Sequence, residues 1–109
     1  MLTALVLATL IGGEPPELHI LDAVYGNPDT DGLCDATLAV LDQCDERESC
    51  LISISNGICG DPARGQFKRL FIAFKCGPYP ARTVAGREGA VLRLSCTSAS
   101  KNLHVGAEE

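Results

Sequence analysis

Residues 55–76 read SNGICGDPARGQFKRLFIAFKC, and this stretch decides the fold. Its second part, residues 70–76, is rich in aromatic and branched apolar residues and ends in cysteine, which is typical of a buried strand. The part before it contains an Asn-Gly pair and a Gly-Asp-Pro triplet, and both are turn signals. The stretch therefore predicts a loop of fixed shape that leads directly into a core strand.

The cysteine content sets the class of protein. A chain of 109 residues is long enough for one domain, and it has six cysteines, no tryptophan and five Phe or Tyr residues to fill a core. We expect the six to form disulfides in a secreted or extracellular protein. They are Cys34, Cys44, Cys50, Cys59, Cys76 and Cys96. No two of them have the Cys-x2-Cys spacing of zinc sites, so we expect no metal and no cofactor.

The charge pattern restricts the partners. The formal net charge is −5, and the acidic residues are spread along the chain. We expect no nucleic-acid partner, because binding to nucleic acid requires a basic stripe. The apolar segment 1–13 is too short to span a bilayer, so we expect no membrane insertion. That segment fits a buried strand better than a signal sequence, because it has alternating apolar residues and no basic start.

The remaining pattern predicts a mainly β domain with one or two short helices. Residues 18–26 and 51–55 have the composition of strands. Residues 34–44 have leucines at helical spacing behind Asp35, a good helix N-cap. Residues 77–89 contain two prolines and three glycines, which predicts a linker.

Taken in order, these pieces resemble a known family. The matching stretches are LHILDAVYG, CDERESCLISISNG, CGDPARGQFKRL and LFIAFKC, which together span residues 18–76. The combined pattern is similar to the sea-urchin-egg-lectin type domain, the family of rhamnose- or galactose-binding lectins. The resemblance implies a small α+β domain, an antiparallel β-sandwich-like lectin fold held by disulfides.

The chain departs from the family pattern at three places. Asn27 follows Tyr25-Gly26 where the family has arginine, and Cys59 precedes the Gly-Asp-Pro turn where the family cysteine follows it. The family's opening strand, Glu-Gly-x-x-Leu-x-Leu-x-Cys, matches residues 87–96, REGAVLRLSC, after the closing strand instead of before it. We therefore divide the chain into a lectin-like part (1–77), a linker (78–87) and an opening-strand segment (88–109).

Three arrangements explain the displaced segment 88–109. It is a circular permutation, the start of a truncated second repeat, or a strand exchanged in a homodimer. The resemblance implies a bond between the cysteine of the closing strand and that of the opening strand. An even cysteine count then favours a Cys76–Cys96 bond, within one chain or across a dimer. The partners of the other four cysteines stay open at this point.

The resemblance also implies a sugar site. A neutral sugar offers hydroxyl groups that donate and accept hydrogen bonds, together with an apolar ring face, so fixed polar groups are needed to recognise it. Asp61 and Asn56 would accept from hydroxyls, Lys68 would donate, and the backbone of Gly65 would approach closely. The ring of Tyr25 would lie against the sugar. Glu88 is carried over from the opening strand.

The predicted function is therefore non-enzymatic, metal-independent binding of galactose- or rhamnose-type sugars, as glycans or free sugars. The sequence has no Gly-x-Ser-x-Gly or His-Glu-x-x-His motif, so we expect no enzyme activity. Two alternatives stay open. One is a protein-interaction or structural module that keeps the fold without binding sugar, and the other is a fragment of a larger receptor or enzyme.

Overall fold

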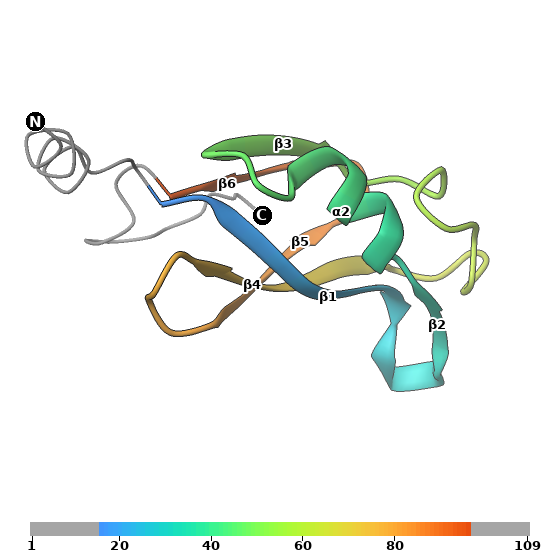
Figure 1. Cartoon of the computed structure of the whole chain (residues 1–109). Helices are drawn as coiled ribbons and strands as arrows, with labels where there is room; N and C mark the ends of the chain where they lie inside the picture. The colour runs from blue at the N-terminus through green and yellow to red at the C-terminus, as the bar shows by residue number, and fades with distance from the viewer. Residues whose placement is uncertain (1–15, 97–109) are drawn as a thin grey trace, which may run out of the picture.

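The computed structural model describes residues 16–96. They form two helices and six strands, and the strands are arranged in two antiparallel sheets (Figure 1). The larger sheet has the strand order β2-β1-β4-β5, and the smaller sheet pairs β3 with β6. The elements are β1 (Leu18–Asn27), the 3₁₀ helix η1 (Pro28–Thr30), β2 (Gly32–Asp35), α2 (Thr37–Cys44), β3 (Ser49–Ser53), β4 (Arg69–Cys76), β5 (Arg82–Arg87) and β6 (Val91–Ser95). This arrangement confirms the mainly β prediction with a short helix.

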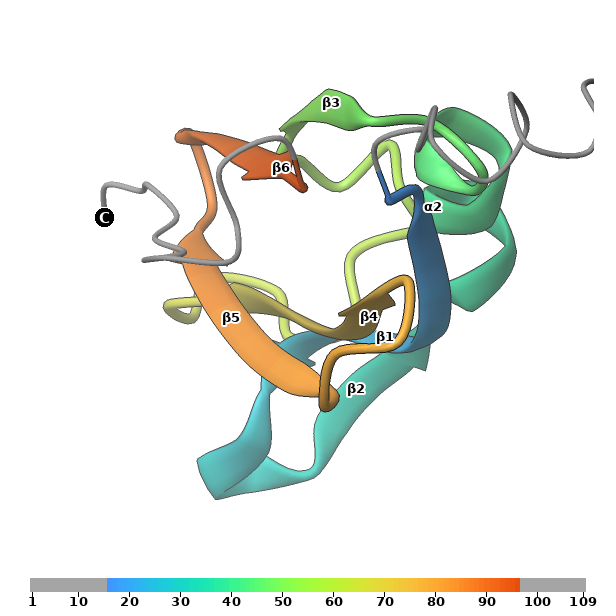
Figure 2. The same cartoon turned by 60° about the vertical axis from the view of Figure 1, so that its left-hand side comes forward.

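The core lies between the two sheets. In Figure 2, β3 and β6 lie above β1 and β4, while β5 and α2 flank the space between them. The alternate residues of β4 that point inward are fully or almost fully buried, as the two-residue period of a strand requires. The largest buried side chains are Tyr25, Phe74, Leu18, Ile52, Ile54, Leu70, Ile72, Leu92 and Leu94.

The predicted strands at 18–26 and 70–76 are present as β1 and β4, which pair with each other at the centre of the larger sheet. The predicted helix is shorter than residues 34–44, because its first residues belong to β2. Cys34 pairs with Tyr25 in that ladder, and the helix starts after it. The N-cap is Ala36 and not the predicted Asp35, although Oδ1 of Asp35 accepts a hydrogen bond from the backbone N–H of Thr37, the first helical residue, at 3.0 Å.

The prediction of a linker at 78–87 is wrong for most of this range. Only residues 77–81 form a connection, and Arg82–Arg87 is the edge strand β5, paired with β4. The glycine in this strand is needed for packing rather than flexibility. A Cβ at Gly86 would lie 2.7 Å from Cδ1 of Ile54, so a larger residue would collide with the core.

The C-terminal segment is part of the same domain. Strand β6 pairs with β3 of its own chain, with Ile52 opposite Leu92. The disulfide between Cys76 and Cys96 joins β4 to the end of β6, which is the pairing that the cysteine count favoured. The fold therefore needs no exchanged strand from a second chain. The strand expected within 1–13, and residues 97–109 of the third segment, lie outside the described residues.

Two further disulfides complete the framework. Cys34–Cys59 joins β2 to the loop after β3, and Cys44–Cys50 joins the end of α2 to β3. Each bond restricts the unfolded chain, and this is how small extracellular domains supplement a limited core. Across residues 16–96 the structure has no helix with the length and apolar character needed to cross a membrane.

Candidate functional site

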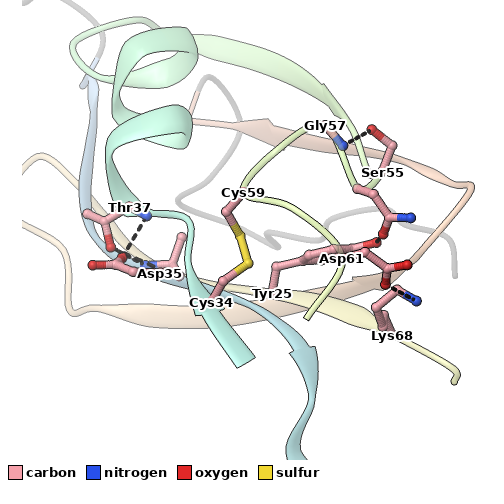
Figure 3. Close-up of a disulfide and its surroundings, with 11 residues drawn as sticks. Tyr25, Cys34, Asp35, Thr37, Ser55, Gly57, Cys59, Asp61 and Lys68 are labelled. Carbon is pink, nitrogen blue, oxygen red and sulfur yellow. Dashed lines mark hydrogen bonds and ion pairs between the residues drawn. A yellow bond between two sulfur atoms is a disulfide. The ribbon is translucent and has the colours of Figure 1, made fainter. Parts of the chain in front are cut away.

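The loop 54–68 connects β3 to β4 and contains four of the six predicted site residues. The Cys34–Cys59 disulfide attaches it to β2, directly beside the buried ring of Tyr25 (Figure 3). Hydrogen bonds within the loop, such as that from the N–H of Gly60 to the carbonyl of Asn56 at 2.8 Å, close its turns. The loop is therefore a fixed structure that presents polar groups beside the core.

The side chain of Lys68, the last residue of this loop, makes several of the polar contacts that hold the loop together. The whole residue is only 3% exposed, and its Nζ lies 3.0 Å from Oδ1 of Asp61 and 3.4 Å from Oε1 of Glu88. The same Nζ donates to the backbone carbonyls of Ala63 and Gln66, both at 3.1 Å. The hydrogen bond that Lys68 donates to Asp61 raises the pKa of Lys68, and Glu88 adds to this effect, whereas burial opposes it. A buried ammonium group surrounded by four oxygens is fully satisfied within the protein.

Tyr25 contributes its hydroxyl group to the site but not its ring. The hydroxyl donates to Oδ1 of Asn56 at 2.8 Å, while the residue is 0% exposed. Burial raises the pKa of Tyr25, and the negative charge of Glu88 raises it further. The expectation that this ring lies against a sugar is therefore wrong, because no face of it is accessible.

Gly65 and Gly26 have conformational roles near this region. Gly65 has a φ of 71°, which is in the left-handed range that favours glycine, and the space where its Cβ would lie is open. Its backbone is in the loop around Lys68, but no contact places its amide in the site. At Gly26, a Cβ would collide with the carbonyl oxygen of Gly32, so this glycine lets β2 approach β1.

The structure therefore brings five of the six predicted residues together: Tyr25, Asn56, Asp61, Lys68 and Glu88, which we call the Lys68 cluster. Glu88 enters from the turn after β5, where its N–H donates to the carbonyl of Lys68 at 3.0 Å. The carboxylate side chains of Asp61 and Glu88 are 34% and 36% exposed, although each places one oxygen on Lys68. The solvent side of the cluster is thus a pair of fixed acceptor groups.

A second feature was not predicted from the sequence. Phe67 is 54% exposed, and it forms one wall of a hollow of about 330 Å³ with Arg69 and the end of β1. The guanidinium carbons of Arg69 and Arg87 lie 5.3 Å and 6.0 Å from the centre of the Phe67 ring. The two-residue period of a strand was the available signal. Counted back from the inward-facing Leu70, it places Lys68 on the inner face and Phe67 and Arg69 on the outer face.

Residues 16–96 contain no group of three or more His, Cys, Asp or Glu side chains arranged as metal ligands. No family model matches the chain, and no solved structure matches it.

Proposed function

We propose that this protein binds neutral sugars of the galactose or rhamnose type at the Lys68 cluster, outside the cell and without catalysis. The observation that carries the proposal is the convergence of Asp61 and Glu88 on one lysine from separate loops. The family resemblance assigned Glu88 to the site although it lies after the closing strand. Three disulfides in a small domain support an extracellular location.

The cluster has the groups that sugar hydroxyls require. Asp61 and Glu88 each have a partly exposed carboxylate, and hydrogen bonds from hydroxyls to charged acceptors are stronger than those between neutral groups. The amide oxygen of Asn56 accepts from Tyr25, which orients its NH₂ group as the donor available to a ligand. Lys68 holds the two carboxylates in place, so little ordering entropy is lost when a sugar binds.

The buried ring of Tyr25 limits the expected affinity. Without an aromatic face at the cluster, binding depends on hydroxyl contacts, and a dissociation constant of about 1 mM would correspond to roughly −4 kcal/mol. Titrations to roughly tens of millimolar sugar are therefore needed to fill such a site.

An NMR titration of the labelled protein with galactose and with rhamnose tests the proposal. At least one of the sugars is expected to shift the amide signals of Asn56, Asp61 and Glu88. Asp61→Asn keeps the shape of the side chain and removes the charged acceptor, so it should weaken binding on the order of tenfold. Asp42→Asn, an exposed position on α2, is the matched control and should bind like the parent. Absence of shifts with both sugars would contradict the proposal.

A structural role for the same cluster is the second candidate. It is favoured by the four protein oxygens around Nζ of Lys68, which leave this group no need of a ligand. In that case Asp61→Asn would lower the melting temperature, and no sugar would shift any signal of the cluster. A protein partner would then be expected to bind the parent and Asp61→Asn equally, provided that both are folded.

A further inference from the structure

The hollow beside Phe67 lies on the outer face of the larger sheet and is separate from the Lys68 cluster. Its volume is about 330 Å³, and it lies where the end of β1, η1 and the start of β4 meet. The side chains that give it chemical character are Asn27, Asp29, Phe67, Arg69 and Phe71. We call it the Phe67 hollow. A hollow of this size is at the lower end of those that hold small molecules.

Two arginines next to this hollow form no ion pair with any acidic residue in the described part of the chain. Arg69 and Arg87 are directly opposite each other in the β4–β5 ladder, where like charges destabilise a sheet. Within residues 16–96, the ion pairs found at or below 4.0 Å involve Lys68 and neither arginine. Their only aromatic partner in that range is Phe67, over which both guanidinium groups lie. The pair is thus a local positive charge on a protein whose net charge is −5.

Phe67 supplies what the Lys68 cluster lacks, which is an accessible aromatic ring. The residue is 54% exposed, and it lines the hollow together with Phe71 of β4. An aromatic face of this kind packs against the apolar C–H face of a sugar ring. Asp29, an exposed residue, adds a carboxylate acceptor at the same hollow. The negative charge of Asp29 also repels an anion bound at this hollow.

We propose that the Phe67 hollow binds a pyranose that carries an anionic group, a carboxylate or a sulfate. The anionic group would pair with Arg69 and Arg87, the ring would lie against Phe67, and a hydroxyl would donate to Asp29. A neutral sugar leaves the two guanidinium groups unpaired, and a simple anion makes no use of Phe67. The proposal does not depend on the Lys68 cluster, because the two sites lie on opposite faces of β4.

Parallel NMR titrations of the labelled protein with glucuronate, galactose 6-sulfate, galactose and acetate test this inference. Glucuronate or galactose 6-sulfate should shift the amides of Phe67, Arg69 and Arg87, and the comparison of these two identifies the preferred anionic group. Salt at about 0.5 M should weaken the effect, because it screens exposed charges. Galactose should leave these three amides unchanged, whatever it does at Asn56 and Asp61.

Variants separate a specific site from general attraction. The double variant Arg69→Gln with Arg87→Gln, and the single variant Phe67→Ala, should each weaken binding on the order of tenfold. Lys75→Gln removes a positive charge from the outer face of the same strand, away from the hollow, and should bind like the parent. The inference is overturned if neither anionic sugar shifts the three amides, if acetate or galactose shifts them equally, or if Lys75→Gln weakens binding as much as the double variant does.

Discussion

Lys68 and Arg69 are adjacent in sequence, but the first is buried and the second is exposed. Lys68 faces inward and is enclosed by four oxygens, and its carbonyl accepts from the N–H of Glu88 just beyond the end of the β4–β5 ladder. Arg69 faces outward and lies opposite Arg87, and its guanidinium group lies over the ring of Phe67. A buried cation must be paired because desolvation is costly, whereas an exposed one can remain unpaired. The inner charges therefore fix the loop, and the outer charges are available to a ligand.

Removal of the Cys34–Cys59 disulfide should have the largest effect on stability, and it should affect the Lys68 cluster more than the Phe67 hollow. Cys34→Ala with Cys59→Ala should lower the free energy of unfolding by about 3 kcal/mol, since the bond closes a loop between residues 25 apart in sequence. The loop 54–68 would lose its attachment at Cys59, so neutral sugar binding at Asn56 and Asp61 should weaken strongly. Phe67 is two residues from the start of β4, so anionic sugars should still bind there. Denaturant unfolding and the two titrations measure this. Equal loss at both sites would contradict the separation.

The next effect compares the neighbouring cations directly. Lys68→Met removes the partner of two acidic groups and should lower the melting temperature clearly, because Asp61 and Glu88 are then left facing each other. Arg69→Met should change stability by no more than about 0.5 kcal/mol, as is usual for exposed positions. Thermal unfolding of both variants under one condition measures the difference. A similar loss of thermal stability in the two variants would show that the contacts of Lys68 stabilise the fold no more than those of Arg69.

Tyr25 reports on the inner region through its pKa. Burial raises this pKa above the ordinary value of 10.0, so Tyr25 should remain neutral at a pH where an unfolded tyrosine ionises. The associated stability is complete below pH 10.0 and is lost as the pH rises through the folded pKa. In a Tyr79→Phe background, phenolate absorbance follows Tyr25 alone. Ionisation at or below pH 10 would mean that the ring is accessible.

The smallest expected effect concerns the outer pair of arginines. Arg87→Gln removes a like-charge contact but also a cation–π contact with Phe67, and each is worth less than about 1 kcal/mol. The net change in stability should be within about 0.5 kcal/mol. Added salt should stabilise the parent more than Arg87→Gln, because only the parent has the repulsion to screen. A larger salt response in Arg87→Gln would indicate that the pair is not repulsive.

The local signals of the sequence predicted most of the inner region. The apolar run 70–76 and the turn residues before it each specify a local feature that is present in the fold. The even number of cysteines agrees with the Cys76–Cys96 bond. The exposure of a side chain depends on what packs over it, which a local pattern does not contain. For that reason Tyr25 was expected at the surface and is buried.

The same reasoning explains the other differences. Residues 82–87 have little apolar character, but the free edge of β4 pairs with them and makes a strand of the expected linker. The Phe67 hollow combines residues from β1, η1 and β4, so it exists only once these elements have met. Glu88 could be assigned to the site only through the family resemblance, because nothing in its immediate sequence indicates a ligand.

A crystal structure of the protein with bound galactose or rhamnose tests the central claim most directly. The account predicts sugar hydroxyls within hydrogen-bonding distance of the exposed carboxylate edges of Asp61 and Glu88, with Lys68 still 3.0 Å from Asp61 as in the free protein. A sugar bound away from these carboxylates, or one that displaces Asp61 from Lys68, would contradict it.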